Sequence, residues 1–595
     1  MVSSVETLRA EGHSTVHVGD NVYTSNNQCL ADLRLTDPSD DKTRIERTKG
    51  GLLKDAYRWI LNHADFQRWR NDKESRLLWI RGDPGKGKTM LLIGIIEELE
   101  QQSKQPEDAC LLSYFFCQGT DSRLNKATAV LRGLIYLLLT QEASLMSHIR
   151  EKYERAGKQL FEDVNAFHAL SKIFTNMLQD PNLKGAYLIV DALDECETDL
   201  PQLLGLIVQS ASTSPYVKWI ISSRNEAHIE ARLSLNGAQT MLSLELNAEH
   251  VSHAVEMFID FNVSQLASIK HDSTLQEEVR KQVHQKANGT FLWVAFVFQE
   301  LEQVDSWDIL QVLEEVPADL NPLYDRMMRQ VQQLKRKDPE FCRLVLLTMT
   351  LAYRPLHLLE LGTLSGLPGQ ISKNLNSTAK IVVKCGSFLT IREDYIYFIH
   401  QSAKDYLDFN ASGTIFPSGR GAFHYNLFSR SLQVMFETLQ RNMYRLHQPG
   451  ISINSVKQPH PDPLAPVRYS CVYWASHLDE AYRNSSPCRS DLVDGGKTHL
   501  FLQKRFLYWL EALSLIKSMS SSVRTISTLL TLLKVSPDFR YAMTFKTEAN
   551  LGIVGRVSSF RNSARCASVC SVQQVGDGEL PPSSICIGSC LQSGQ

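Results

Sequence analysis

The sequence Leu77-Leu-Trp-Ile-Arg-Gly-Asp-Pro-Gly-Lys-Gly-Lys-Thr-Met90 joins an apolar run to a glycine-rich turn. The apolar residues from Leu77 to Ile80 predict a buried strand. The turn matches the phosphate-binding pattern G-x4-G-K-[ST], which begins at Gly82 and ends at Thr89. The run from Met90 to Leu99 predicts a helix. A chance glycine-rich turn would lack these neighbours, so the order of strand, turn and helix predicts a P-loop.

The residue types of this turn suit a bound phosphate chain. Its glycines let the backbone wrap closely, so that N–H groups point at the anion, and the following helix adds the positive end of its dipole. We expect Lys88 to supply a charge to the β- and γ-phosphates and the Thr89 hydroxyl to ligate Mg²⁺. The residues predicted to contact ATP or GTP with its Mg²⁺ are Gly82, Asp83, Pro84, Gly85, Lys86, Gly87, Lys88, Thr89 and Met90.

An acidic motif follows a second buried run, in Ala186-Tyr-Leu-Ile-Val-Asp-Ala-Leu-Asp-Glu-Cys196. Asp191 ends the predicted strand, and we expect it to hold Mg²⁺ through a water from a strand adjacent to the P-loop strand. We expect Glu195 to orient or deprotonate the attacking water, with Asp194 as a second candidate catalytic carboxylate. Alone, the segment is equally typical of an acidic loop. The alternating strands and helices between it and Lys88 favour the catalytic interpretation.

A further predicted strand, Val217-Lys-Trp-Ile-Ile-Ser-Ser-Arg224, carries a cation at its carboxyl end. In open α/β sheets ligands lie along that edge, so Arg224 is predicted to sense the γ-phosphate. The alternative is a surface arginine on a loop, because the prediction rests only on the position of Arg224 at the end of the strand.

Composition excludes several classes of protein. The chain has 595 residues, enough for about three to five domains. Lys+Arg number 63 and Asp+Glu 65, for a net charge of −2, so no global basic field recruits nucleic acid or anionic membrane. Most cysteines outside the tail, such as Cys110, Cys117, Cys342 and Cys385, stand singly in apolar stretches, as buried thiols of a reducing compartment do. There is no apolar signal segment and no transmembrane-length apolar run, which predicts a cytoplasmic protein.

Apolar patterning predicts a multidomain fold, α/β plus α. Residues 1–40 are polar and predict an arm, with weak alternation from His17 to Tyr23 that would suit a short strand. The tail's Cys566-x3-Cys570 and Cys586-x3-Cys590 lack the spacing and histidines of a zinc site. The other predicted regions are a P-loop NTPase domain at 41–235, a helical domain at 236–330, a winged-helix-like domain at 331–415, a C-terminal helical domain at 416–540 and a low-order Ser/Gly/Cys tail at 541–595.

Helices at Phe341–Ala352 and Pro355–Leu367 and later β-type runs predict the winged helix. The runs are Ile381–Val383, Phe388–Ile391 and Tyr395–Ile399. Its segments are apolar and lack a basic recognition helix, which argues against DNA binding. His400 follows the last run and, from the residues alone, is interpreted as a satisfied core histidine. Farther on, Phe501–Leu533 predicts one long helix.

Several motifs, in order, resemble those of one family. The sequence is similar to the fungal NACHT proteins, NOD-like signal-transduction NTPases of the heterokaryon-incompatibility type, over residues 28–535. The matching segments are Cys29–Arg34, Lys49–Asp55, Arg81–Thr89, Ile189–Cys196, Asn288–Val294, Phe398–Leu407 and Tyr469–Trp474.

The resemblance implies a five-stranded parallel sheet, a helical domain, a winged helix and a further helical domain. It also implies an ADP-held closed state and an ATP- or GTP-driven open homo-oligomer with an effector partner. By that pattern His400 touches the β-phosphate, Arg224 is the sensor arginine, and the segment from Arg44 to Lys49 covers the base. Family members commonly add an N-terminal effector domain and a C-terminal propeller or repeat array. The sequence has neither, and we expect its Ser/Cys tail to mark a truncated or mis-spliced gene model.

Three functions remain open at this stage. The favoured one is a nucleotide-driven switch with slow NTP hydrolysis, because the predicted site, made of the P-loop, the acidic motif and Arg224, is coupled to a winged helix. A scaffold with an idle NTPase site would not need Lys88, Thr89, Asp191 and Glu195 to be intact. A P-loop metabolic kinase would need a pocket for an acceptor substrate, and it would leave the long helical regions without a role.

Overall fold

The computed structural model describes residues 18–102, 110–213, 216–233, 239–447, 451–484, 488–493 and 495–535. The chain forms two compact units, the first comprising Met1–Gln330 with His400–Ala403 and the second Val331–Ile399 with Lys404–Gln595. The predicted tail at 541–595, its cysteine pairs and the first 17 residues of the predicted arm lie outside the described residues. None of the helices in the described ranges has both the length and the hydropathy needed to cross a lipid bilayer.

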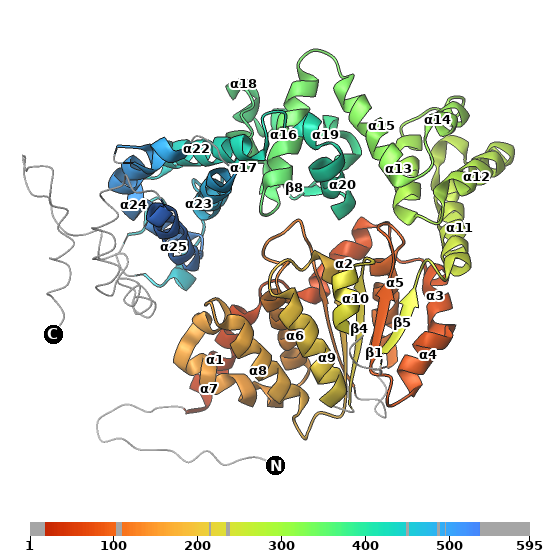
Figure 1. Ribbon diagram of the computed structural model, residues 1–595, viewed down its shortest axis with the longest axis horizontal. Helices are drawn as coiled ribbons and strands as arrows, with labels where there is room; N and C mark the ends of the chain where they lie inside the picture. The colour runs from red at the N-terminus through yellow and green to blue at the C-terminus, as the bar shows by residue number, and fades with distance from the viewer. Residues whose placement is uncertain are drawn as a thin grey trace, which may run out of the picture. The chain divides into compact units, whose positions relative to one another are not determined.

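A five-stranded parallel sheet is the centre of the first unit (Figure 1). Its order is β2-β3-β4-β1-β5, and it confirms the α/β class. The run that forms β5 was predicted to be helical; it has three polar residues among five, because it is an edge strand. The strands are β1 (Leu77–Arg81), β2 (Leu111–Phe116), β3 (Ala186–Asp191), β4 (Val217–Ser223) and β5 (Gln239–Ser243).

The expectation that Asp191 ends the strand next to the P-loop strand is wrong. β4 lies between β1 and β3, pairing Ile80 with Ser222 and Val190 with Ile221. Parallel strands are joined by long crossovers, so their order in the sheet does not follow from their order in the sequence. All three carboxyl ends still meet at one edge of the sheet.

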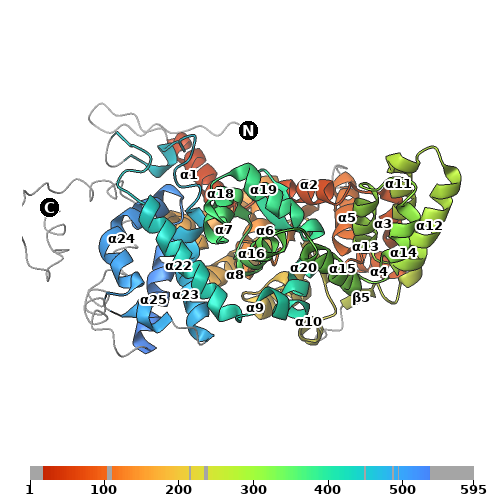
Figure 2. The same cartoon turned by 90° about the horizontal axis from the view of Figure 1, so that it is seen from above.

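Helices cover both faces of this sheet (Figures 1 and 2). Alternate strand residues, such as Trp79 and Trp219, pack in one core with α6, α8 and α9. Burial on both faces explains why these strands are continuous apolar runs. The helices up to β5 are α1 (Val18–Leu33), α2 (Pro38–Thr48), α3 (Lys54–Asn62), α4 (Ala64–Asn71), α5 (Lys88–Gln102), α6 (Ala127–Gln141), α7 (Ser147–Ala156), α8 (Ala166–Leu178), α9 (Leu200–Thr213) and α10 (Ala227–Leu233).

The predicted polar arm does not extend to residue 40, and its possible strand is wrong from Val18 onward, because α1 occupies Val18–Leu33. Cys29 and Leu33 of α1 are buried in the sheet core. Arg132 of α6 donates hydrogen bonds to the Asp32 and Leu33 carbonyls at 2.8 and 2.9 Å. The sequence did not predict this helix, because its apolar residues form only a narrow stripe.

Five helices follow β5. The second unit then contains a small antiparallel sheet of order β6-β8-β7. A helix, a short strand, further helices and a hairpin give the connectivity of a winged helix. The elements from β5 onward are α11 (Ala248–Gln265), α12 (Ser273–Ala287), α13 (Phe291–Leu301), α14 (Ile309–Glu315), α15 (Leu320–Gln332), α16 (Asp338–Leu351), β6 (Leu356–His357), α17 (Leu358–Leu364), α18 (Gly369–Ser372), α19 (Leu375–Lys384), β7 (Leu389–Arg392), β8 (Tyr395–Phe398), α20 (Gln401–Asp405), α21 (Ser412–Ile415), α22 (Arg420–Thr438), α23 (Arg468–Arg483), α24 (Lys497–Leu515) and α25 (Ser520–Val535).

Two element predictions in this unit are wrong. The run Ile381–Val383 is part of α19 rather than a strand, since Ile381 and Val382 are both buried while Val383 is exposed, which is not strand alternation. The predicted helix Phe501–Leu533 is two helices, and Lys517 between them has a left-handed φ of 57°, which ends α24.

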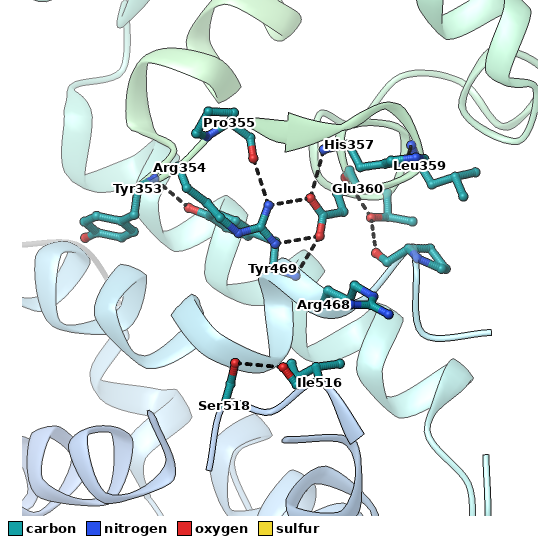
Figure 3. A network of polar contacts seen from close by, with 12 residues as sticks. Tyr353, Arg354, Pro355, His357, Leu359, Glu360, Arg468, Tyr469, Ile516 and Ser518 are labelled. Atoms are coloured by element: carbon teal, nitrogen blue, oxygen red, sulfur yellow. Dashed lines mark hydrogen bonds and ion pairs between the residues drawn. The ribbon is translucent and has the colours of Figure 1, made fainter. Parts of the chain in front are cut away.

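A buried ion pair joins distant parts of the second unit (Figure 3). Arg354 donates two hydrogen bonds to Glu360, at 2.8 and 2.7 Å. The Glu360 side chain is only 1% exposed, and it also accepts from the backbone N–H groups of His357 and Tyr469 at 2.9 Å each. One carboxylate therefore satisfies the starts of both α17 and α23.

We expect Glu360→Ala to lower the free energy of unfolding of the second unit by about 3–5 kcal/mol, because it leaves the Arg354 guanidinium buried without its counter-charge. Pulse proteolysis of the full chain in urea, with peptides from α17 and α23 identified by mass spectrometry, measures the change. Glu340→Ala, at an exposed position of α16, is the control and should cost less than about 1 kcal/mol. Equal losses in the two variants would contradict the ion pair's role.

Candidate nucleotide-binding site

The P-loop connects β1 to α5 at the carboxyl edge of the sheet. Gly85 and Gly87 have φ of 79° and 83°, which side-chain-bearing residues rarely adopt. Space also demands glycine: a Cβ on Gly85 would lie 2.9 Å from Thr290 Cγ2, and one on Gly87 would lie 2.9 Å from the Phe291 ring. Glycine at these two positions therefore has both a conformational and a steric cause.

Lys88 begins α5, and its side chain folds back over the loop. Its Nζ donates to the carbonyl oxygens of Gly82 at 2.5 Å and Asp83 at 3.0 Å. Burial lowers the pKa of Lys88, although Asp194 and Asp191 oppose the shift. Thr89 and Met90 lie in the same first turn, where helix N–H groups have no partner within the helix.

Asp83 and Lys86 are directed toward protein groups. The Asp83 N–H donates to Glu245 at 2.7 Å, and Asn225 Nδ2 donates to the Asp83 carboxylate at 3.2 Å. Lys86 Nζ donates to the carbonyl of Asn288 at 2.8 Å. Pro84 lies between them and is half-buried. No sequence motif predicts Glu245, because this residue reaches the loop through the position of β5 in the folded sheet.

Asp191 ends β3 as a buried carboxylate. It accepts a hydrogen bond of 2.5 Å from the Ser222 hydroxyl of β4, whose oxygen accepts from the Ala192 N–H at 2.9 Å. Ala192 has φ 53° and ψ 52°, a left-handed conformation that is uncommon for a residue other than glycine and that clusters at functional sites. The turn directs the next residues, Asp194 and Glu195, along the edge of the sheet.

Asp194 holds Arg224. Its carboxylate accepts from the Arg224 backbone N–H at 3.0 Å and lies 3.1 Å from Arg224 Nε. Burial raises the pKa of Asp194, while the charges of Arg224 and Lys88 oppose the shift. The predicted sensor arginine is thus oriented by a residue that the sequence had suggested as a catalytic carboxylate. A surface arginine on a loop, which was the alternative, would not be held by a buried carboxylate in this way.

Glu195 is the candidate general base. Its Oε2 accepts a hydrogen bond of 2.8 Å from the Gly119 N–H, in the loop after β2. Burial, followed by the negative charge of Asp194, raises the pKa of Glu195 to about 8. A carboxyl with a pKa near the working pH suits proton transfer.

His400 lies among cations of the first unit. Burial, then the charges of Lys49, Arg224 and Lys88, holds its pKa well below the usual value, so the ring is neutral at pH 7. The Ser402 N–H donates to His400 Nδ1 at 3.1 Å, and the Ser402 hydroxyl lies 2.8 Å from the same nitrogen. The neutral ring therefore carries its proton on Nε2, where it can donate to an anion.

Lys49 is a site residue that the sequence did not single out. It follows α2 at the C-cap and precedes two glycines with φ of 88° and 87°. Its side chain is solvent-accessible, yet enough protein surrounds the ammonium group that desolvation lowers its pKa, against the opposing charges of Asp191 and Glu195. Within residues 44–49, the segment predicted to cover the base, Lys49 is the residue that interacts electrostatically with Asp191 and Glu195 of the acidic motif.

Together these residues suit a phosphate chain with a metal ion. Three cations and a donating histidine offer charge and hydrogen bonds to an anion. Among the described residues, no three His, Cys, Asp or Glu side chains converge to hold a metal. Mg²⁺ at Thr89 and Asp191 would therefore need phosphate oxygens and waters as its other ligands, which is how Mg²⁺ is commonly held.

Comparisons with known proteins agree with the motifs. Residues 55–224 match the family described as Nephrocystin 3, N-terminal. The chain is 48% identical over 544 residues to the vegetative incompatibility protein HET-E-1 of Podospora anserina. That alignment covers 87% of this chain and 40% of the relative, so the chain spans about two fifths of the relative's length.

Solved structures with some likeness include a Walker-type ATPase of Pyrococcus abyssi, at 12% identity and a TM-score of 0.27, covering 58% of this chain and 93% of that one. The ORC1 protein of Aeropyrum pernix in complex with DNA matches at 13% identity and a TM-score of 0.28, covering 60% of this chain and 97% of that one.

With Glu195 as the base, we expect kcat/KM for NTP hydrolysis to rise with pH. The carboxyl must be deprotonated to accept a proton from water, and a pKa of about 8 leaves most of it protonated at pH 7. The rise from pH 7 to pH 9 should be about tenfold. Steady-state hydrolysis at constant ionic strength with Mg²⁺ measures it.

Glu195→Gln should give a low, flat profile. Asp194→Asn removes the neighbouring negative charge and should move the midpoint to lower pH. A flat profile in the unchanged protein would rule Glu195 out as the base.

Proposed function

We propose that the chain, which is 48% identical to the incompatibility protein HET-E-1 over 544 residues, is a NACHT-type P-loop NTPase that acts as a nucleotide-binding signalling switch in fungal non-self recognition or programmed cell death. It alternates between a closed state that holds ADP or GDP and an open, self-associating state that holds ATP or GTP. Slow hydrolysis resets the switch.

The observation that carries this proposal is the group of cations around a neutral histidine. Lys49, Lys88 and Arg224 each contribute positive charge at His400. The carboxylates of Asp191, Asp194 and Glu195 offset part of this charge, and an anion bound among the cations would offset more of it in a desolvated site. A nucleoside polyphosphate on the P-loop would supply such an anion, which supports a nucleotide as the ligand of this site.

His400 gives the site a way to distinguish nucleotides. Its Nε2–H donates to a diphosphate in the closed state. A third phosphate brings more negative charge, for which Arg224 leaves Asp194, and the differential contacts shift the population. The chain passes from the second unit to the first at His400 and returns after Ala403, so the backbone joins this segment of the first unit to the second unit at both of its ends.

Slow turnover follows from the same contacts. Glu195 is held by the Gly119 N–H and is largely protonated at pH 7, and Arg224 is held by Asp194. Both groups must be released before they can act on a water or a γ-phosphate. Mg²⁺, when bound at Thr89 and near Asp191, would neutralise phosphate charge.

The nucleotide released from the purified full-length chain tests the proposal. We expect near-stoichiometric ADP or GDP after denaturation, and the identity of the base names the ligand. Lys88→Ala should lose it, because the variant removes the ammonium group that the P-loop pattern assigns to the phosphates. Lys335→Ala, at an exposed lysine of the second unit, is the control and should retain it. A chain that is empty and takes up no added nucleotide would favour a scaffold with an idle NTPase site.

His400 should contribute to diphosphate affinity more than to triphosphate affinity. We expect His400→Ala to weaken ADP or GDP binding about tenfold or more, the value of one hydrogen bond to a charged group. His400→Gln keeps a nearby N–H donor and should restore part of the affinity. Calorimetry with both nucleotides measures the ratio; equal losses for the two would contradict the role in the closed state.

A further inference from the structure

The outer side of the P-loop is covered by a turn between α12 and α13. This turn, Asn288–Leu292, is called here the P-loop cover. Asn288 and Gly289 have left-handed φ of 45° and 61°, which reverse the chain sharply. Within the cover, Thr290 and Leu292 would lie 2.9 and 3.0 Å from a Cβ on Gly85. Side chains of the cover thus lie so close to the glycine of the loop that the loop cannot change its path without displacing them.

Lys86 ties the loop to this cover. Its Nζ donates to the Asn288 carbonyl at 2.8 Å, at the C-cap of α12, where the helix dipole favours a cation. Asn288 in turn donates through Nδ2 to Asp319 at 3.1 Å. Lys88 reaches the loop's own carbonyls at Gly82 and Asp83, so the two lysines of the motif hold different partners.

The cover begins α13, and α13 leads to the histidine of the site. Phe296 of α13 packs edge-on against Tyr324, with ring centroids 5.7 Å apart. Tyr324 is fully buried, and its hydroxyl lies 2.9 Å from the Ser402 hydroxyl. Ser402 holds His400 Nδ1. A series of contacts therefore connects the P-loop to His400 through α13, Tyr324 and Ser402, and all of it lies within the first unit.

We propose that Lys86 and Tyr324 are positioning residues at the two ends of a series of contacts through α13, which couple the P-loop conformation to the orientation of His400. Lys86 acts on the nucleotide through the loop backbone and does not bind phosphate. The inference rests on the proposed function, since it requires a nucleotide on the P-loop.

Coupling requires that both ends act on one element. Loss of either end leaves α13 free to move relative to its target, so the second loss adds little. Because His400 serves the diphosphate-bound state, loss of either end lowers diphosphate affinity and leaves triphosphate affinity unchanged. A residue that only stabilises the fold would change both affinities alike.

A double-mutant cycle on the full chain tests the inference, with ADP, GDP and their non-hydrolysable triphosphate counterparts as probes. We expect Lys86→Met and Tyr324→Phe each to weaken diphosphate binding about three- to tenfold, the range of single hydrogen bonds. The double variant should lose no more diphosphate affinity than the single variant with the larger loss. Triphosphate affinity should change less than about twofold.

Matched controls separate this from general loosening. Lys286 donates to the carbonyls of Leu313, Glu314 and Val316, the same kind of lysine–carbonyl contact away from the P-loop. The Tyr136 hydroxyl donates to Asp37 at 3.3 Å, also in the first unit. Lys286→Met and Tyr136→Phe should leave both affinities within about twofold.

Three outcomes would overturn the inference: a loss in Lys86→Met as large as in Lys88→Ala, which would make Lys86 a phosphate ligand; losses in the two single variants that multiply in the double; or unchanged affinities in both single variants. Failure of the proposed function gives a different result, because the unchanged protein and Lys88→Ala would then both fail to bind nucleotide.

Discussion

The position of β4 between β1 and β3 is the constraint on which the site depends. Its register places Ser222 beside both the P-loop strand and the strand of Asp191. Through this one hydroxyl, which donates to Asp191 and accepts from Ala192, the acidic motif is fixed relative to the loop. Arg224 follows β4 directly, so the same strand also delivers the cation that Asp194 holds.

The site concentrates buried charges of both signs. Around His400 the three cations oppose protonation of the ring, and around Glu195 burial and Asp194 oppose ionisation. Each group is held in its less charged form, at a cost in solvation that a neutral scaffold would have no reason to carry. An arrangement of this kind responds to the charge of its ligand, which is what a switch between di- and triphosphate needs.

The sequence predicted what is local. The P-loop, the acidic motif and the hairpin after Phe388 each lie in contiguous residues whose types follow from their chemistry, and the strands buried on both faces are unbroken apolar runs. It missed what depends on distant partners. The edge strand β5 has too few apolar residues to stand out, and the apolar residues of α1 form only a narrow stripe in its sequence. Lys49 and Glu245 belong to the site through residues far away in the chain, and no spacing rule connects them.

Lys86 has a consequence for how this protein can vary over evolution. Its partner is a backbone carbonyl, which every residue at position 288 presents, so no side-chain exchange there can compensate for a change at position 86. Covariation between the two positions is therefore not expected in related sequences, even though they touch. The P-loop pattern leaves position 86 open to any residue, but here a long cation should persist without a visible partner, as a constraint that pairwise sequence statistics would overlook.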